Sequence, residues 1–216
     1  MNIWLKKQAD LVSSLSTQPL IIVVRIPINE LDNCDLKPVI KLITGLRDAN
    51  IKHIEIAWSH HKNWSFFIEE LNKAFQGFSF GAASVSHINA LDEIKQLGFS
   101  YAMSPCWNLE LQEKAKVLDQ ILIPGVLTPS EIYQAINFGH KIIKLFPATL
   151  VGSSYLNQIK ASFSTFPFVI AAGGLRLNDL NAWLKNGCNA IALGRSFSQK
   201  ENSLLLLKKW IIENNL

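Results

Sequence analysis

Cysteine is scarce in this sequence, and the few cysteines present do not form a recognisable set. The 216 residues include only Cys34, Cys106 and Cys188, which lie far apart and show no Cys-x-x-Cys spacing. Disulfide-dependent domains are dense in cysteine, and zinc sites built on cysteine need closely spaced pairs. The cysteine count therefore excludes a disulfide framework and a cysteine-based zinc site. It favours a reducing compartment, which we expect to be the cytoplasm.

Long apolar runs are also lacking. The longest ones, at 19–24 and 204–207, fall far short of the roughly 20 residues that a transmembrane helix requires. The opening segment, Met-Asn-Ile-Trp-Leu-Lys-Lys at 1–7, does not show the order of charged, apolar and small residues that a secretory signal has. We therefore expect a soluble protein with no membrane partner.

Charge of one sign is not concentrated anywhere along the chain. The 21 basic and 17 acidic residues give a formal net charge of +4, and no long basic run occurs. This pattern excludes a dedicated nucleic-acid surface, whereas a local pocket for an anion remains compatible with it. We expect no metal centre either, because the adjacent His60 and His61 would point apart in an extended segment and no helical i, i+4 pair of ligands occurs.

Short apolar segments alternate with helical patterns along the chain, in which 49% of residues are hydrophobic. Eight such segments are each followed by a helical pattern, at intervals of about 20 to 30 residues, and this alternation is typical of parallel βα units. We place the strands at 20–25, 53–58, 78–84, 101–103, 120–123, 141–147, 168–171 and 190–193.

These units predict one (β/α)8 TIM barrel domain over residues 1–216, with an additional amphipathic helix at 2–15 before the first strand. No low-complexity linker or change of composition marks a second domain. The alternative is an open, doubly wound sheet. That fold has less support, because the Gly-x-Gly-x-x-Gly motif of dinucleotide-binding sheets does not follow the first strand.

Lys144 stands out in the apolar segment Lys-Ile-Ile-Lys-Leu-Phe-Pro at 141–147. Strand alternation places it on one face with Ile142 and Phe146, so its amine is expected to lose hydration. Burial lowers the pKa of a lysine and leaves a fraction of free amine that can attack a carbonyl carbon. The segment by itself more often indicates a lysine that extends its amine to water at a strand end. Other residues must decide between these interpretations.

Polar residues recur at the carboxyl ends of the predicted strands, where barrel enzymes carry their reactive groups. Arg25, Glu55 and Ser84 lie at such ends, and Lys144 lies late in its own strand. Glu55 and Lys144 would both point into the barrel. They form either a structural ion pair or a catalytic pair in which the amine is the nucleophile and the carboxylate moves protons.

Two loops with glycine follow the last two predicted strands. Gly173 and Gly174 follow one strand, and Gly194, Arg195 and Ser196 follow the next. Small residues allow backbone N–H groups to approach an anion, and in many barrels these two loops hold a phosphate. Tight turns also need glycine, so the pair at 173–174 alone is weak evidence. Its position one strand before Gly-Arg-Ser strengthens the prediction of a phosphate site.

Several motifs then occur in a characteristic order. They are Phe-Gly-Ala-Ala-Ser-Val at 80–85, Ser-Pro at 104–105, Pro-Gly-Val-Leu-Thr-Pro-Ser-Glu at 124–131, Gly-His-Lys-Ile-Ile-Lys-Leu-Phe-Pro-Ala at 139–148, and Gly-Gly at 173–174. Together they resemble the class I 2-keto-3-deoxy-6-phosphogluconate (KDPG) / 4-hydroxy-2-oxoglutarate aldolases. The resemblance extends from about Pro19 to about Ser198, and its Lys-Leu-Phe-Pro and Pro-Gly-Val-x-Thr-Pro segments are specific.

The resemblance implies an aldolase that needs no metal and no cofactor. The Schiff-base lysine of the family corresponds to Lys144, and the acid/base glutamate of its second strand corresponds to Glu55. The substrate-binding positions that we predict are Arg25, Ser84, Pro105, Phe146, Gly173, Gly174, Gly194, Arg195 and Ser196. The implied partner is a small 2-keto acid, and the family is commonly trimeric, so we expect a homo-oligomer.

The sequence departs from the family pattern at several positions. Ala83 replaces a glycine, and Ser84 replaces a threonine but keeps its hydroxyl. Ala172 replaces the threonine before Gly-Gly, and Ser59 stands where some members carry an arginine for the pyruvate carboxylate. The changes leave the Schiff-base residues in place and bear on substrate preference.

The implied reaction is the reversible cleavage of KDPG to pyruvate and glyceraldehyde 3-phosphate. A further candidate substrate is 4-hydroxy-2-oxoglutarate, which yields pyruvate and glyoxylate. Two alternatives remain open. One is a related pyruvate aldolase for an unphosphorylated 2-keto acid, and the other is a catalytically silent barrel that binds a phosphosugar and in which Lys144 and Glu55 form only an ion pair.

Overall fold

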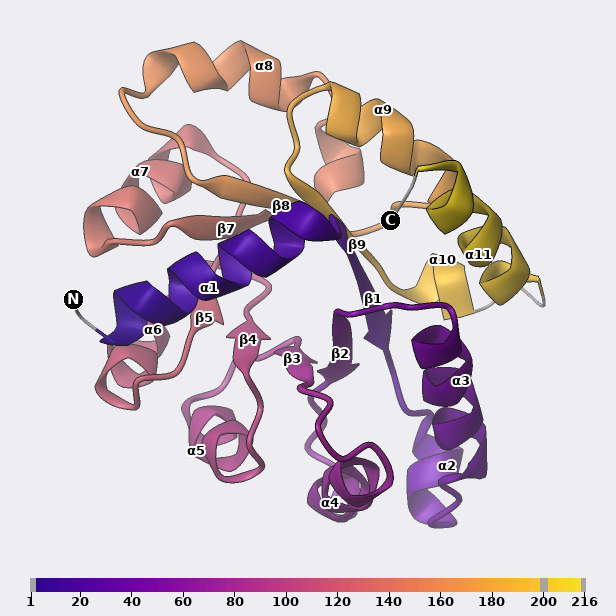
Figure 1. The fold of residues 1–216 in the computed structure, drawn as a ribbon. Helices are drawn as coiled ribbons and strands as arrows, with labels where there is room; N and C mark the ends of the chain where they lie inside the picture. The colour runs from indigo at the N-terminus through magenta and orange to yellow at the C-terminus, as the bar shows by residue number, and fades with distance from the viewer. Residues whose placement is uncertain (1–2, 199–201, 215–216) are drawn as a thin grey trace.

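A computed structural model describes residues 3–198 and 202–214 and shows one parallel sheet surrounded by helices (Figure 1). The strands are β1 (Leu20–Val24), β2 (Ile54–Ala57), β3 (Gly81–Ala83), β4 (Tyr101–Met103), β5 (Leu122–Ile123), β6 (Gly125–Val126), β7 (Ile142–Leu145), β8 (Phe168–Ala172) and β9 (Ala190–Leu193). Their spatial order is β5-β4-β3-β2-β1-β9-β8-β7-β6. Every neighbouring pair is parallel.

The two ends of this sheet meet at Pro124, which alone separates β5 from β6. On one side, the Ser104 N–H donates to the Ile123 carbonyl at 2.9 Å, and on the other the Lys144 N–H donates to the Pro124 carbonyl at 2.9 Å. The fifth strand predicted at 120–123 is therefore present as β5, and β6 continues it beyond Pro124, which has no N–H to donate. The predicted (β/α)8 barrel is confirmed, with its fifth strand in two pieces.

Helices follow the strands and cover the outside of the sheet (Figure 1). They are α1 (Ile3–Thr17), α2 (Ile28–Asp32), α3 (Lys37–Asp48), α4 (Trp64–Ala74), α5 (Ile88–Gln96), α6 (Leu109–Val117), α7 (Pro129–Phe138), α8 (Tyr155–Ile159), α9 (Leu180–Lys185), α10 (Arg195–Ser198) and α11 (Ser203–Glu213). Short 3-10 turns occur at η1 (Ala148–Leu150), η2 (Lys160–Ser162) and η3 (Leu177–Asp179). None of the helices in the described ranges is both long and apolar enough to cross a membrane.

Some element boundaries differ from the predicted ones. The third strand is only Gly81–Ala83 instead of 78–84, and β7 is Ile142–Leu145 instead of 141–147. The segment between β1 and α3 contains the short helix α2. A helix of this length covers little more than one turn, so its apolar residues cannot display a helical period.

Helix α7 begins at a capping box and ends directly before β7. The Thr128 N–H donates to Glu131 Oε2 at 2.8 Å, and the Glu131 N–H donates to Thr128 Oγ1 at 3.3 Å. The helix ends at Gly139, whose φ of 106° is in the left-handed region that favours glycine. The chain then turns directly into β7, which carries Lys144.

Helix α1 closes the amino end of the barrel (Figure 1). Leu15 is fully buried against the inward-facing residues of the strands, and Leu11 and Val12 pack beside it. The Gln8 side chain accepts a hydrogen bond from the Lys141 N–H at 2.8 Å, and the Gln18 amide donates to the Asn50 carbonyl at 2.8 Å. These contacts hold α1 across the amino end, so the interior is left to open at the carboxyl end.

Candidate active site

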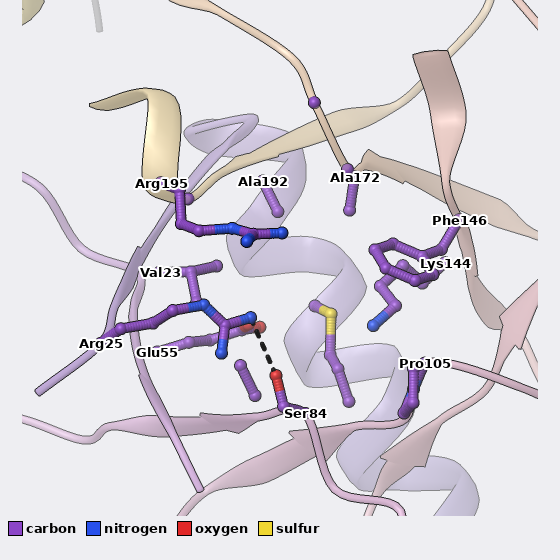
Figure 2. A pocket seen from close by; sticks show the side chains of 15 residues that line it. Val23, Arg25, Glu55, Ser84, Pro105, Lys144, Phe146, Ala172, Ala192 and Arg195 are labelled. Atoms are coloured by element: carbon purple, nitrogen blue, oxygen red, sulfur yellow. Dashed lines mark hydrogen bonds between the residues drawn. The ribbon is translucent and has the colours of Figure 1, made fainter. Parts of the chain in front are cut away.

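A cavity of about 180 Å³ lies at the carboxyl ends of the strands, opposite α1 (Figure 2). Its lining comes from strands and loops all around the barrel, namely Val23, Arg25, Glu55, Ala83, Ser84, Met103, Pro105, Lys144, Phe146, Ala172, Gly173, Gly174, Ala192, Gly194 and Arg195. The structure thus brings together every residue that we predicted for the site except Ser196. Ser196 lies in α10, and its side chain is outside the described part of the chain.

The cavity exists because several inward-facing side chains are small at this height of the barrel. Ala83, Ala172 and Ala192 contribute only a methyl group each to its wall. The layer nearer α1 is filled by larger side chains such as Ile142 and Ile170, both completely buried. An interior packed with branched residues has no room for a ligand. The change from large to small side chains places the open space next to Lys144.

Lys144 projects into the cavity from β7, and only 6% of its surface is exposed. Its Nζ atom lies 4.8 Å from the centre of the Phe146 ring (Figure 2). Burial lowers the pKa of Lys144 to about 8, while the Glu55 carboxylate opposes this shift and the Arg25 guanidinium adds to it. A lysine with this pKa holds a substantial fraction of free amine near neutral pH, which is the form that attacks a carbonyl carbon.

Glu55 lies across the cavity from Lys144 (Figure 2) and is 1% exposed. Burial raises the pKa of Glu55 to about 7, while the Lys144 charge and the Tyr101 hydroxyl oppose the shift. Near neutral pH the carboxyl group can therefore take up and release a proton. Its Oε1 atom has no hydrogen-bond partner. The two side chains are coupled electrostatically across the cavity rather than joined in a direct ion pair.

Arg25 and Arg195 bring positive charge to the mouth of the cavity (Figure 2). The Arg25 Nη2 group donates to Ser84 Oγ at 3.1 Å, and Ser84 has a φ of 64°, which a residue other than glycine adopts rarely. The pKa of Arg25 is lowered by burial and then by the charge of Arg195. Two guanidinium groups that repel each other across one cavity favour an anionic ligand between them.

Glycine occurs in the two loops for different structural reasons. Gly173 and Gly174 have φ values of 95° and 80°, and a Cβ on Gly174 would lie 2.5 Å from Thr149 Oγ1. The backbone conformation and the packing of this loop therefore require glycine whether or not an anion binds. A Cβ on Gly194 would meet only the Val23 Cβ, at an ordinary 3.9 Å. Glycine at 194 is thus not needed for packing, and it leaves the cavity open.

The positions that depart from the family pattern differ in their relation to the cavity. Ala83, Ser84 and Ala172 line it, whereas Ser59 does not belong to the lining. The Ser59 hydroxyl instead accepts a hydrogen bond from the His61 N–H at 3.2 Å. An alanine at 172 offers no hydrogen-bond donor to a ligand.

Five residues of the lining are not among the predicted site residues. Ala83 and Ala172 were noted only as departures from the family pattern, and Val23, Met103 and Ala192 escaped the sequence analysis altogether. Val23, Met103 and Ala192 each lie at or near the carboxyl end of a strand, two positions before a predicted site residue, and face the barrel interior. Their side chains are apolar, so only the alternation along each strand could have identified them. They form part of the wall and offer no group for chemistry.

The strand order and the lysine, carboxyl and guanidinium groups in one cavity define the class of protein. It is a (β/α)8 barrel with a polar cavity at the carboxyl ends of its strands, where barrel enzymes carry their reactive groups. Residues 12–209 match the family model described as KDPG and KHG aldolase. The chain therefore belongs to the KDPG and KHG aldolase family, as its motifs indicated.

Curated relatives match over part of the chain. The 2-dehydro-3-deoxy-6-phosphogalactonate aldolase of Escherichia coli K12 is 27% identical over 114 residues, which are 53% of this chain and 56% of that protein. The 2-dehydro-3-deoxy-phosphogluconate aldolase of Treponema pallidum is 26% identical over 124 residues, which are 57% of this chain and 59% of that protein. The chain thus spans somewhat more than half the length of these curated relatives.

Solved structures share the fold over nearly the whole chain. The KDPG aldolase of Legionella pneumophila, with pyruvate captured as a covalent carbinolamine intermediate, has a TM-score of 0.78 and 21% identity, covering 94% of this chain and 96% of that one. A native KDPGal structure has a TM-score of 0.74 and 22% identity, covering 91% of this chain and 94% of that one. At these identities the matches establish a common barrel architecture.

Proposed function

We propose that the protein is a class I aldolase that cleaves a phosphorylated 2-keto-3-deoxy sugar acid, with KDPG as the leading substrate and pyruvate and glyceraldehyde 3-phosphate as products. The observation that carries this proposal is the buried Lys144 amine facing the buried Glu55 carboxyl group in a cavity that two arginines border. Membership of the family and the names of the relatives, which act on 2-dehydro-3-deoxy phosphosugar acids, support the choice of substrate.

The reaction begins when the free amine of Lys144 attacks the C2 ketone of the substrate. Glu55 supplies protons to the C2 oxygen, which leaves as water, and a cationic iminium forms on Lys144. Glu55 then accepts the proton of the C4 hydroxyl group, the C3–C4 bond breaks, and its electrons move into the iminium. The aldehyde departs and leaves an enamine of pyruvate, which Glu55 protonates at C3. Hydrolysis of the resulting imine releases pyruvate and frees Lys144.

Binding groups surround this pair at both ends of the cavity. Ser84 and Arg25, which share a hydrogen bond, are the groups that we assign to the substrate carboxylate. The loop at 173–174, Arg195 and Ser196 are the groups that we assign to the distal phosphate. Contacts to this part of the substrate, remote from the bond that breaks, supply binding energy that orients the C2 carbon against Lys144.

Trapping with borohydride tests the proposed function. Reduction in the presence of pyruvate is expected to add one pyruvyl-derived group to Lys144, which peptide mass spectrometry would locate. Lys144→Met should lose trapping and lower turnover by about 10³-fold or more, because the nucleophile is gone. The matched control is Lys141→Met, which removes an exposed lysine of the same segment. An unmodified Lys144 in folded wild-type protein contradicts the proposal.

A second candidate is a pyruvate aldolase for an unphosphorylated 2-keto acid such as 4-hydroxy-2-oxoglutarate. Ala172 favours it, because this cavity residue has no hydroxyl group to donate to a phosphorylated substrate. Values of kcat/KM for KDPG, its galactonate isomer and 4-hydroxy-2-oxoglutarate, measured on one preparation, separate the candidates. We expect the phosphorylated substrates to be preferred, because Arg195 faces the same cavity. Preference for 4-hydroxy-2-oxoglutarate would favour the second candidate.

Wild type and Lys144→Met also distinguish an aldolase from a catalytically silent barrel. A silent binder would be stabilised by a phosphorylated sugar acid in a thermal-shift assay, with no pyruvate produced and no adduct on Lys144. An aldolase instead produces pyruvate that a coupled lactate dehydrogenase assay detects. Activity that survives EDTA would show that no metal ion is required.

We also propose that residues 1–216 act as one domain in a cytoplasmic homo-oligomer, a trimer by resemblance to the family. Closed symmetry is the general rule for soluble oligomers. Light scattering coupled to gel filtration should give about three times the 24.2 kDa of the chain. A mass of one chain at assay concentrations would contradict the trimer.

A further inference from the structure

Two buried polar atoms in the barrel interior lack hydrogen-bond partners of good geometry. One is Oε1 of Glu55 and the other is the hydroxyl oxygen of Tyr101, whose side chain is 3% exposed. A buried hydroxyl group without a partner is unfavourable by roughly 1–3 kcal/mol, so most such groups in native proteins are satisfied. The family motifs and the mechanism above give Tyr101 no role, so its position calls for a separate explanation.

The sheet register brings these two side chains toward each other. Gly81 of β3 pairs with Glu55 of β2 on one side and with Tyr101 of β4 on the other. All three positions therefore lie in one row across three neighbouring strands, facing the barrel interior. Gly81 stands between the acid and the phenol.

The lack of a side chain at Gly81 lets the tyrosine ring cross β3. A Cβ on Gly81 would lie 2.4 Å from Tyr101 Cζ and 2.8 Å from its hydroxyl oxygen. The φ of Gly81 is not among the positive values found in the described chain, so the backbone does not require glycine here. Instead, the Tyr101 ring leaves no space for a side chain at position 81. The hydroxyl group thus lies over β3, directly beside the strand that carries Glu55.

We propose that Tyr101 is a positioning residue for Glu55, reaching through the gap at Gly81 to donate its hydroxyl hydrogen to the Glu55 carboxylate. This inference rests on the proposed function, in which Glu55 moves protons. The phenol remains protonated, because burial and then the Glu55 charge raise the pKa of Tyr101 well above its ordinary value. An ionised carboxylate can only accept, so toward it the phenol acts as the donor, and this hydrogen bond stabilises the ionised form of Glu55 relative to the protonated form.

Other charged groups act in the same region and define the background of any titration. Lys144 on β7 favours the ionised form of Glu55, as the Tyr101 hydroxyl does from β4. Arg25 after β1 and Arg195 at the start of α10 border the cavity, and Arg25 and Cys106 act on Lys144. Removal of the Tyr101 hydroxyl leaves all of these groups in place, so its effect on Glu55 can be isolated.

The test is Tyr101→Phe, which removes the hydroxyl group and keeps the ring that fills the gap. The acidic limb of the pH profile of kcat/KM should move up by about one pH unit, because Glu55 then loses a donor to its charged form. At pH 7 the variant should lose roughly 3–10-fold in kcat with little change in KM. The matched control is Tyr155→Phe, which removes a hydroxyl group bound to the Leu127 carbonyl at 2.6 Å, outside the cavity lining.

A direct readout of Glu55 keeps the inference separate from the proposed function. Infrared difference spectra follow the protonated carboxyl stretch against pH, and Glu55→Gln assigns the band to Glu55. Its titration should shift upward in Tyr101→Phe whether or not the correct aldol substrate is known. If the Glu55 titrations of wild type and Tyr101→Phe coincide, the inference is overturned. A change in melting temperature alone would show only that the hydroxyl group contributes to stability. Failure of pyruvate trapping on Lys144 with a shifted titration would instead overturn the proposed function alone.

Discussion

At the scale of single residues, burial sets the chemistry of the ionisable groups inside this barrel. The pKa of Lys144 is lowered to about 8 and that of Glu55 is raised to about 7, so that both groups can exchange protons near neutral pH. Desolvation is the largest cause in both cases, and it disfavours the charged form of each group. A lysine and a glutamate that would be permanently charged in water thereby become a candidate nucleophile and a candidate proton carrier.

His140 provides a second case of burial, away from the cavity. It is 3% exposed, and neither ring nitrogen has a hydrogen-bond partner. Its ring stacks on Phe138 with centroids 5.3 Å apart and contacts the edge of Trp4 at 5.2 Å. Burial, together with the smaller effect of the Lys116 charge, lowers the pKa of His140 from 6.5 to about 3. The folded protein therefore holds this histidine in its neutral form.

This histidine should make the protein sensitive to acid. The unfolded chain binds the proton near pH 6.5 and the folded chain only near pH 3, so the stabilisation is complete above pH 6.5 and is lost as the pH falls toward 3. We predict that the free energy of unfolding falls by about 2 kcal/mol between about pH 7.5 and pH 5 through this group. Urea titrations of wild type and His140→Leu at both pH values measure it, with a smaller decrease expected for the variant. An equal decrease in the free energy of unfolding for wild type and His140→Leu would contradict the prediction. The control is His87→Leu, which replaces an exposed histidine.

At the scale of elements, the loops after β8 and β9 contain glycine for different reasons. The loop after β8 needs glycine for its own conformation, and the loop after β9 needs it only to leave space, as the contacts at Gly174 and Gly194 show. The two loops therefore respond differently to substitution. The sequence motifs do not distinguish these glycines, whereas their backbone conformations and neighbouring atoms do.

Gly174→Ala tests the loop after β8. Its new Cβ would lie 2.5 Å from Thr149 Oγ1 in a backbone with a φ of 80°, so Thr149 and the loop must move. We predict a loss of about 1–3 kcal/mol in stability and a rise in KM for the phosphorylated substrate. Gly77→Ala is the matched control, because Gly77 has the same φ of 80° and nothing within 4 Å of the Cβ position. Equal losses in both variants would show that packing at Gly174 is unimportant.

At the scale of the whole molecule, the two ends of the barrel have separate tasks. The amino end is closed by α1 and packed with large apolar side chains, and the carboxyl end carries the cavity and its charges (Figures 1 and 2). This division is general among barrel enzymes, in which the amino-terminal face serves stability. Stability and activity should therefore respond to different substitutions.

Leu15→Ala tests this separation. Leu15 is completely buried between α1 and the barrel interior, so its truncation should reduce the free energy of unfolding by about 2–5 kcal/mol. Under conditions where the variant remains folded, we expect kcat and KM to stay within about twofold of wild type, because Leu15 does not line the cavity. Denaturant unfolding and steady-state kinetics measure the two effects. Ile3→Ala, at a residue that is 60% exposed, is the control for a change in the same helix.

Much of this organisation was predictable because it depends on periodic local patterns. Alternation along 141–147 predicted that Lys144 shares a face with Phe146, and both side chains line the cavity. The order of βα units predicted the barrel, and the amphipathic pattern at 2–15 predicted the helix before it. The family motifs identified the chain as a member of its family.

Tertiary structure alone decided which groups face one another across the barrel. Residues that are neither adjacent nor periodic have no local signal for their contact, so the crossing of Tyr101 over Gly81 toward Glu55 could not be predicted from the strands one at a time. The separation of Ser59 from the cavity has the same origin. The sequence by itself determined the elements, their order and the inward faces of the strands. The curvature and closure of the sheet determined the distances on which pKa values and proton transfer depend.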